Sequence, residues 1–340
     1  MRRTMRHTVK AVLMGLILTA TASVAADGRM AERNETLMEA VGPLAPLKGV
    51  MLKTKQQHGP VVLIVSGSGP TDRDGNSPLG LKASTYRLLA QGLAAQGIAT
   101  VRIDKRGMFE SAKAVADPNN VTIQDYADDV SSWVKTIRQE SDYACVWVLG
   151  HSEGGLVALV AGLQNTDICG LILAATPGRP LGLILREQLR GNPANALIID
   201  QALAAIDALE SNRRVDPLTL HPALRRLFSL DVQGFLINTF ALDPVHLIAG
   251  YKKPILIVQG LRDLQVSALD AQRLSQAATH STLILLPDTN HVLKCVAADD
   301  QTANLATYSD PLQPLAPGIV DVIAHFISAS TVTRSECSDH

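Results

Sequence analysis

The sequence carries almost no net charge, because 31 lysines and arginines balance 32 aspartates and glutamates over 340 residues. Basic residues are scattered except at the extreme N-terminus, so the chain lacks the electrostatic footprint of a nucleic-acid-binding protein. It also lacks an H-E-x-x-H motif and any cluster of cysteines and histidines at zinc-ligand spacing. We therefore expect no nucleic-acid partner, no catalytic metal and no cofactor.

No hydrophobic run reaches the ~20 residues that a helix needs to cross a bilayer. One short apolar segment, residues 11–20, follows a basic N-terminus and precedes the small residues at 23–26. This order is typical of a secretory signal peptide. We expect residues 1–26 to be removed on export, leaving a periplasmic or secreted protein without a stable membrane span; a retained membrane anchor is the alternative.

Cysteine is scarce, with Cys145, Cys169, Cys295 and Cys337 as its four positions. Disulfides persist in oxidising compartments, so export makes these residues candidates for bridges. Cys145 and Cys169 each open a predicted strand, and two adjacent parallel strands would place them side by side. We expect this bridge, with two buried thiols as the alternative. A second bridge, from Cys295 to Cys337, would tie the C-terminal tail to the loop after residue 291, although four cysteines allow three pairings.

Short β-branched runs alternate with amphipathic segments from about residue 36 onward, which predicts a parallel sheet with crossover helices. Thr122 and Asp125 approximate a capping box at one helix start. The expected strands cover residues 61–65, 99–103, 145–149, 169–175, 254–258 and 282–286, and the expected helices cover 86–96, 123–138, 154–163 and 318–328.

The alternation stops after Pro177, and only helical patterns follow until about residue 249, with helices expected over 181–189, 194–209, 222–228 and 232–242. We therefore predict one α/β domain, formed by residues 27–177 and 251–340, that is interrupted by a helical cap or lid over residues 178–250. Apolar side chains of this insertion would either line an acyl pocket or pack the lid itself; they are Leu181, Leu183, Ile184, Leu185, Phe228, Phe235, Leu236, Ile237 and Phe240.

The segment GHSEG at residues 150–154 matches the pattern G-x-S-x-G. In this pattern a strand turns sharply into a helix with a strained central residue, so the flanking positions need minimal side chains. The segment follows a buried strand and opens an apolar helix, which is the required context. We predict Ser152 as a nucleophile; a glycine-rich turn used only for packing is the alternative.

A serine nucleophile needs a base that is oriented by an acid, and in this strand-turn-helix context the acid precedes the histidine along the chain. Asp263 lies just past the strand at 254–258, and His291 follows the strand at 282–286. We predict these two residues as acid and base. Asp288 is an alternative acid, whereas His151, His280 and His325 are expected to be structural.

An acyl-transfer site also needs donors for the oxyanion. We expect the backbone amides of Glu153 and Ser68 to supply them. The loop around Ser68 lacks the third glycine of a dinucleotide fingerprint and the lysine of a P-loop, and DRDGN at 72–76 lacks the closing glutamate of a calcium loop. We expect instead that Asp72 or Asp74 pairs with Arg106.

Four segments resemble one known family: VVLIVSGSGPTDRDGN from Val61, DKRG from Asp104, GHSEGG from Gly150 and PILIVQGLRDLQV from Pro254. The chain is similar to bacterial α/β hydrolases of the serine aminopeptidase-like and monoacylglycerol-lipase-like carboxylesterase branch. The resemblance implies an α/β-hydrolase fold, with a mostly parallel central sheet flanked by helices and a helical lid insertion. It also implies the triad Ser152, Asp263 and His291. One departure is Ser66-Gly67, which replaces the usual His-Gly before the oxyanion loop.

These features predict a serine hydrolase that cleaves small-molecule carboxylic esters through an acyl-enzyme on Ser152. The apolar insertion favours uncharged esters with short to medium acyl chains. A thioesterase or an aminopeptidase on the same triad is the enzymatic alternative, although the sequence offers no identifiable acidic pair to hold a substrate amine. A non-catalytic binding protein of the same fold is the alternative from another class.

Overall fold

A central eight-stranded sheet organises the chain in the computed structural model, which describes residues 35–55, 59–140, 143–297 and 300–338. The predicted signal peptide lies outside these residues. The strand order is β1-β2-β4-β3-β5-β6-β7-β8; only the β1–β2 and β2–β4 pairs are antiparallel. The strands are β1 (Glu35–Ala40), β2 (Leu47–Leu52), β3 (Val61–Val65), β4 (Ala99–Ile103), β5 (Val146–His151), β6 (Ile168–Ala174), β7 (Ile255–Gly260) and β8 (Thr282–Leu286).

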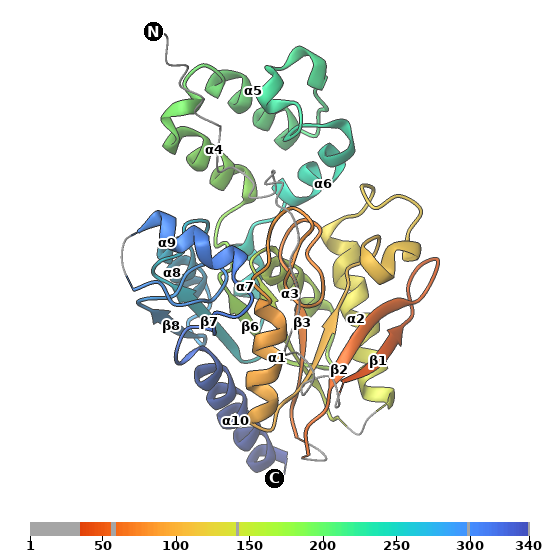
Figure 1. The fold of residues 1–340 in the computed structure, drawn as a ribbon. Helices are drawn as coiled ribbons and strands as arrows, with labels where there is room; N and C mark the ends of the chain where they lie inside the picture. The colour runs from red at the N-terminus through yellow and green to blue at the C-terminus, as the bar shows by residue number, and fades with distance from the viewer. Residues whose placement is uncertain (1–34, 56–58, 141–142, 298–299, 339–340) are drawn as a thin grey trace.

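Helices cover both faces of the sheet, as Figure 1 shows. One face packs against α1 (Thr85–Ala95) and α10 (Ile319–Ser338), and the other against α2 (Ile123–Glu140), α3 (Glu153–Gln164) and α8 (Ala268–Ala277). Alternate residues of β3 belong to different cores: Val61, Leu63 and Val65 join the α2–α3 side, and Val62 and Ile64 join the α1–α10 side. This explains the continuous apolar runs, because a parallel strand that is covered on both faces has no polar side.

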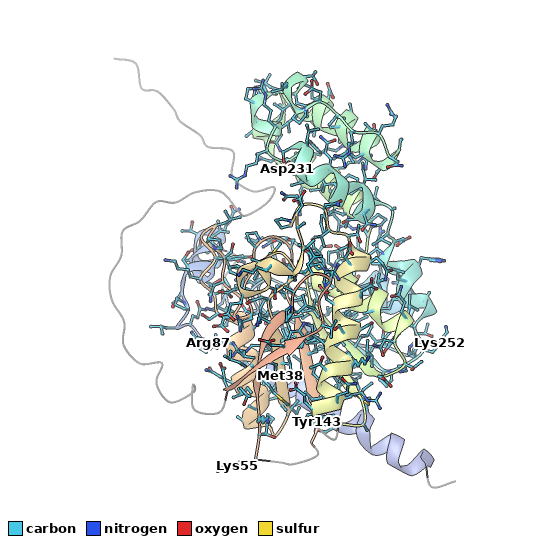
Figure 2. The ribbon with its side chains drawn as sticks, turned by 90° about the vertical axis from the view of Figure 1, so that its right-hand side faces the viewer. Met38, Lys55, Arg87, Tyr143, Asp231 and Lys252 are labelled. Carbon is cyan, nitrogen blue, oxygen red and sulfur yellow. A yellow bond between two sulfur atoms is a disulfide. The ribbon has the colours of Figure 1, made fainter. Side chains whose placement is uncertain are left out.

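The connection between β6 and β7 is helical, as expected, with α4 (Leu181–Gly191), α5 (Ile199–Glu210) and α6 (Leu230–Phe240). It also contains α7 (Pro244–Gly250), which was not predicted. The first three pack around an apolar core of their own. Figure 2 shows Asp231, in the first turn of α6, at the opposite end of the molecule from Tyr143, which precedes β5. The insertion therefore lies toward the carboxyl ends of the parallel strands, where sites are found in open α/β sheets.

Arg179 joins the start of this insertion to the first turn of α8. Its Nε and NH2 groups each donate to a carboxylate oxygen of Asp270 at 2.8 Å. Burial opposes ionisation of Asp270, but hydrogen bonds from Arg179 and Ser267 more than offset this effect and hold its pKa below the usual range. The root of the insertion is thus fixed by a buried ion pair.

Several local expectations are confirmed. Thr122 and Asp125 form the reciprocal hydrogen bonds of a capping box, with the Asp125 amide 3.1 Å from Thr122 Oγ1 and the Thr122 amide 2.9 Å from Asp125 Oδ2. Within the described residues, no single helix is long and apolar enough to cross a membrane, whereas α6 and α7 together meet that criterion as a bent pair.

Other elements differ from the sequence-based expectations. Strands β1 and β2 were not predicted, and neither was α9 (Gln301–Ala306). The helix expected over 194–209 is a 3₁₀ turn followed by α5, because the Asn192 side chain accepts from the Ala194 amide and starts a separate short turn. The helix expected over 222–228 is a single 3₁₀ turn at Pro222–Leu224.

The structure contains the first expected disulfide, between Cys145 and Cys169, with the two Cα atoms 5.3 Å apart. Cys295 has a free thiol, so the second expected bridge, to Cys337, is wrong. The side chain of Cys337 lies outside the described residues. Its helix, α10, runs along the α1 face of the sheet and away from α9, and thus does not bring the tail back to the loop that holds Cys295 (Figure 1).

Candidate active site

Ser152 occupies the sharp turn between β5 and α3. Its backbone angles, φ 55° and ψ −122°, are unusual for a residue with a side chain. A Cβ atom at Gly150 would collide with the backbone of Gly154, and a Cβ at Gly154 would collide with the carbonyl oxygen of Val65. The two glycines of the motif are therefore required sterically, and Ser152 stands at the carboxyl edge of the sheet.

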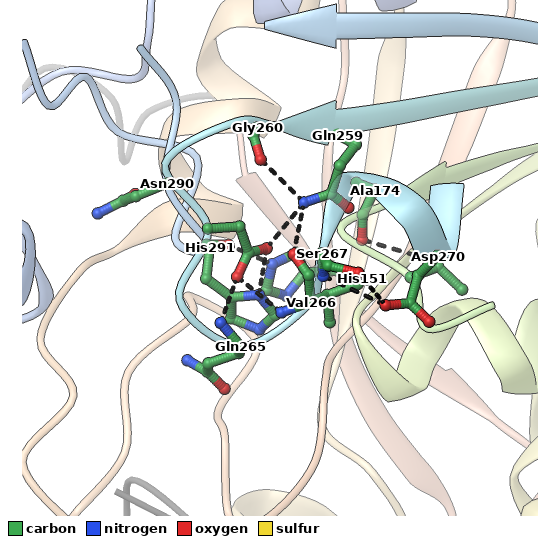
Figure 3. Close-up of polar contacts among 12 residues, drawn as sticks. His151, Ala174, Gln259, Gly260, Gln265, Val266, Ser267, Asp270, Asn290 and His291 are labelled. Atoms are coloured by element: carbon green, nitrogen blue, oxygen red, sulfur yellow. Dashed lines mark hydrogen bonds and ion pairs between the residues drawn. The ribbon is translucent and has the colours of Figure 1, made fainter. Parts of the chain in front are cut away.

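Asp263 and His291 lie together in the loops that follow β7 and β8. Nδ1 of His291 is 2.8 Å from Oδ2 of Asp263, and both side chains are buried, with 7% and 0% of their surface exposed. Since a carboxylate only accepts, Nδ1 carries the proton and Nε2 is left as the basic nitrogen. Figure 3 shows the surrounding contacts.

Three further donors fix the Asp263 carboxylate. The amides of Gln265 and Val266 donate to Oδ1 at 2.7 and 2.9 Å, and Nε2 of Gln259 donates to Oδ2 at 3.1 Å. Four charge-assisted hydrogen bonds, including that from His291, hold the anion in one orientation. Sequence reasoning missed Gln259, whose only signal was a polar residue inside the apolar strand β7.

The loop that carries His291 is braced by segments that were not predicted. The Asn290 side chain donates to Thr307 Oγ1 at 2.7 Å and to Asn304 Oδ1 at 3.1 Å, and it accepts from the Lys294 amide at 3.0 Å. Asn304 belongs to α9, and its side chain donates in turn to the carbonyl of Arg262 at 2.7 Å. The segment after residue 300 thereby connects the two loops that hold Asp263 and His291.

His151 links the residue before Ser152 to the loop of His291. Its Nε2 lies 2.7 Å from the carbonyl oxygen of His291, and its Nδ1 lies 3.0 Å from the hydroxyl of Tyr86. Burial, and to a smaller extent the nearby His291, lower the pKa of His151 to about 3. His151 is therefore neutral and fully engaged, which agrees with the expectation of a structural role. The centroids of the two imidazole rings lie 4.9 Å apart, so the ring of His291 packs near that of the residue preceding Ser152.

The loop after β3 lies against this turn, because a Cβ at Gly67 would be 3.2 Å from Cβ of Ser152. The Gly67 amide donates to the Tyr86 hydroxyl at 3.0 Å, so this amide is already used. Within the described part of the chain, the amides of Ser68 and Glu153 donate to no other group. Glu153 is the first residue of α3, where an amide has no intrahelical partner. These two amides are the ones expected from the sequence as oxyanion donors.

The ion pairs beside the site differ from those expected. Arg106 pairs with Asp125 and Asp129 of α2, at 2.8 and 2.6 Å, rather than with Asp72 or Asp74. The Asp72 side chain instead accepts from the backbone amides of Asp74 and Asn76, so it closes its own turn. Asp74 pairs with Arg102. The cause is topological: α2 starts beside the loop after β4 and supplies nearer carboxylates.

Most apolar side chains considered for an acyl pocket pack elsewhere. Seven of the nine are accounted for in this way. The insertion's own core contains Leu185, Phe228, Leu236 and Phe240, with Leu181 and Ile237 packed against it, and Phe235 packs against the α2–α3 core. Two leucines that the sequence analysis did not single out lie within two positions of Asp263 in the sequence and are exposed: Leu261 by 47% and Leu264 by 51%. Among the residues that the structure describes, no group of three or more histidine, cysteine, aspartate or glutamate side chains is arranged to hold a metal ion.

The chain is similar in sequence to known proteins. A model of the family described as serine aminopeptidase S33 matches residues 79–294, more than half of the chain. Esterase EstD of Thermotoga maritima is 26% identical over 242 residues, which cover 69% of this chain and 54% of EstD. The chain thus spans about half the length of this curated relative.

Solved structures show the same fold. Est1E from Butyrivibrio proteoclasticus is 15% identical with a TM-score of 0.53, over 87% of this chain and 99% of its own. The Pyrococcus furiosus esterase Pf2001 is 13% identical with a TM-score of 0.56, over 91% and 98%. An enol-lactonase from Burkholderia xenovorans LB400 is 20% identical with a TM-score of 0.51, over 86% and 100%. These similarities confirm the predicted α/β-hydrolase fold and carry no information about substrate.

Proposed function

Because the chain belongs to the serine aminopeptidase S33 family of α/β hydrolases, we propose that it hydrolyses carboxylic esters through an acyl-enzyme on Ser152. The observation that supports this most directly is the 2.8 Å contact between His291 Nδ1 and a buried Asp263, beside the strained turn of Ser152. That arrangement has the parts that an activated serine requires.

In the proposed reaction, Oγ of Ser152 attacks the ester carbonyl while Nε2 of His291 takes the proton of the Ser152 hydroxyl. The negative charge that develops on the carbonyl oxygen accepts hydrogen bonds from the amides of Ser68 and Glu153, each contributing about 3 to 4 kcal/mol of transition-state stabilisation. Collapse of this intermediate expels the alcohol, which receives the proton from His291. Water, activated by the same imidazole, then releases the acid, while Asp263 keeps Nδ1 protonated throughout.

An ester with an apolar acyl group fits the surroundings best. Leu261 and Leu264, which lie within two positions of Asp263 in the sequence, have exposed side chains, and EstD and Pf2001 are both named as esterases. The carboxylate nearest to the nucleophile along the chain, that of Glu153, is an ion-pair partner of Lys105 at 3.6 Å, so it is not free to bind a substrate amine. This contact favours ester over aminopeptidase activity.

We further propose that residues 178–250 act as a cap over the site. Support comes from the position of α4 to α6 at one end of the sheet (Figure 1) and from two contacts with neighbouring elements. Gln188 of α4 donates to the carbonyl of Gln265 at 3.4 Å, and the Asn238 side chain of α6 accepts from the Ile123 amide at 3.0 Å. The first contact adjoins the loop that orients Asp263.

The nucleophile is tested with a fluorophosphonate probe, which phosphonylates activated serines. We expect one probe per molecule of parent protein and none on Ser152→Ala, whereas Ser132→Ala, which replaces a partly buried serine of α2, should label like the parent. Folded parent protein that takes up no probe would contradict a catalytic role and favour a binding protein.

The bond that is cleaved is tested by comparing kcat/KM for p-nitrophenyl esters of increasing acyl length with thioesters and with aminoacyl anilides. We expect the esters to be hydrolysed best and the free-amino anilides worst, because the carboxylate of Glu153, next to Ser152 in the sequence, is already paired with Lys105. A preference for thioesters would keep the triad and change the substrate class. Turnover of anilides above esters would contradict the proposal.

We also infer that the protein is exported. The basic and apolar pattern of residues 1–26 supports this inference, and so does the Cys145–Cys169 disulfide, a bond rare in reducing compartments. Fusion of these 26 residues to alkaline phosphatase, which is active only outside the bacterial cytoplasm, provides the test. An active fusion is expected, and a fusion as inactive as one without a leader would exclude export through this segment.

A further inference from the structure

Lys105 is a buried lysine that the proposed reaction does not use. It lies in the turn after β4, with 3% of its side chain exposed. Its ammonium group donates to the carbonyl oxygen of Gly67 at 2.6 Å, lies 3.6 Å from Glu153 Oε1, and stands 5.2 Å from the ring centre of Tyr126. Burial lowers the pKa of Lys105, although Glu153 partly offsets this effect. Burying a cation costs free energy unless its contacts compensate, so the contacts of Lys105 are expected to have a role in the fold or at the site.

The contact with Gly67 determines the direction of a neighbouring amide. The carbonyl of Gly67 and the N–H of Ser68 belong to one peptide unit, which is trans, since the described residues contain no cis peptide bond. In a planar trans peptide these two groups point in opposite directions. An ammonium group that holds the Gly67 carbonyl therefore also sets the direction of the Ser68 N–H.

The same lysine also contacts the residue that carries the second amide. Glu153 supplies the other backbone N–H at the turn of Ser152, and its own side chain is the partner of Lys105. Burial raises the pKa of Glu153, and the nearby lysine partly offsets this effect. One ammonium group thus contacts the Gly67–Ser68 peptide through its carbonyl oxygen and Glu153 through its side chain.

We propose that Lys105 is a positioning residue for the oxyanion site, holding the Gly67–Ser68 peptide in register with the amide of Glu153. The proposal rests on the proposed esterase function, because the two amides matter only where an oxyanion forms. Lys105 itself touches no reacting atom. Its effect is on the transition state, so its loss should lower kcat and leave KM nearly unchanged.

A simpler role must be separated from this one, since Lys105 also neutralises a buried carboxylate. Lys105→Met alone leaves Glu153 without a partner and confounds the two roles. The double variant Lys105→Met, Glu153→Gln removes both charges and still lacks the donor to Gly67. Glu153→Gln alone retains that donor. Comparing the double variant with Glu153→Gln therefore isolates the contact with the carbonyl.

The matched control is Lys253→Met. Lys253 also donates to main-chain carbonyls, those of Thr166 and Ile168, but it lies before β7 at the opposite end of the sheet from Ser152. Its replacement removes a similar ammonium–carbonyl contact without touching the site. We expect its kcat for p-nitrophenyl butyrate to stay within about twofold of the parent value.

The experiment measures kcat and KM for p-nitrophenyl butyrate and Ki for a trifluoromethyl ketone, which forms a tetrahedral oxyanion on the serine. Relative to Glu153→Gln, the double variant should lose at least about tenfold in kcat, with KM changed less than about threefold. Its Ki should rise by the same factor as kcat/KM falls, since the ketone uses the same donors. Thermal unfolding of each variant establishes that it is folded.

Two results would overturn the proposal. If the double variant has the same kcat as Glu153→Gln, Lys105 only balances the charge of Glu153. If kcat falls while Ki for the ketone is unchanged, the amides are still in place. The parent protein separates these failures from failure of the esterase function: a parent without ester turnover or probe labelling refutes the function itself, whereas an active parent with an unaffected double variant refutes only the role of Lys105.

Discussion

The hydroxyl of Tyr86 lies 3.0 Å from Nδ1 of His151, and this contact joins three segments of the site. Tyr86 belongs to α1, accepts a hydrogen bond from the Gly67 amide and donates to His151, which then donates to the carbonyl oxygen of His291. Tyr86 and His151 each have one donor and one acceptor in use, while the Gly67 amide only donates and the His291 carbonyl only accepts. The loop of the expected oxyanion donor and the loop of the expected base are therefore held by one continuous set of hydrogen bonds.

Replacing Tyr86 by phenylalanine should destabilise the protein. The change leaves the Gly67 amide without an acceptor and His151 Nδ1 without a donor, in a region where Tyr86 is 3% exposed. We expect the free energy of unfolding in urea to fall by about 1 to 3 kcal/mol. Tyr143→Phe, at a partly exposed tyrosine outside this network, is the control and should cost less than about 0.5 kcal/mol. Equal losses in the two variants would show that the hydrogen bonds are unimportant.

Stability should depend on pH through His151. Its pKa is lowered from 6.5 to about 3 by burial and by His291, so between these values the unfolded chain binds a proton that the folded chain does not. Stability from this residue is complete above about pH 6.5 and is lost toward about pH 3, with a slope of about 1.4 kcal/mol per pH unit. In urea unfolding, the free energy of unfolding of His151→Gln should change less steeply with pH than that of the parent protein, by the amount that corresponds to about one proton.

An exposed histidine provides the control for this measurement. His280 follows α8 at the surface, and His280→Gln should leave the slope of the parent protein unchanged. If His151→Gln and the parent protein lose stability equally between about pH 6 and about pH 4, the imidazole is protonated in the folded state.

Asp263→Asn should abolish most activity without unfolding the protein. An amide oxygen can still accept from the backbone amides of Gln265 and Val266, but the side chain no longer selects the proton on His291 Nδ1. We expect kcat for p-nitrophenyl butyrate to fall by about 10³- to 10⁴-fold. Asp288→Asn removes the alternative acid, which is 54% exposed and 3.8 Å from Arg262, and should change kcat less than about twofold. The reverse pattern would identify Asp288 as the acid.

Removing the disulfide should affect stability more than catalysis. The bond joins two cysteines with a sequence separation of 24. Cys145 comes just before β5 and Cys169 lies at the start of β6, so the bond is at the opposite ends of these strands from Ser152. We expect Cys145→Ser with Cys169→Ser to lower the free energy of unfolding by about 3 kcal/mol, with kcat retained when folded. Cys295→Ser replaces the free thiol and should match the parent protein.

Sequence patterns were sufficient wherever one local requirement determined the structure. The runs of apolar residues in β3 and β7 predict strands that are buried on both faces, and GHSEG predicts the turn of Ser152 because its glycines avoid backbone collisions. The positions of Asp263 and His291 follow from strand ends. In these cases residues that are close together in the sequence are enough to predict the local structure.

Sequence patterns failed where partners come from distant segments. His151 and Tyr86 are 65 positions apart, and Asn290 meets Asn304 and Thr307 through a helix too short for a clear periodicity. The partner of Arg106 was misassigned because the order of strands, rather than distance along the chain, brings α2 to the loop after β4. In β1, only Met38 and Ala40 are buried, and such an edge strand has little apolar signal.

The apolar core of α4, α5 and α6 is separate from the two cores that flank the sheet. Substitutions inside it should therefore combine almost additively with changes in the sheet, because the two sets of residues share no packing partners. The residues of this separate core can be diversified as one module while the strand that presents Ser152 keeps its support. Three residues of the same segment would be retained, because Gln188, Phe235 and Asn238 contact the rest of the protein.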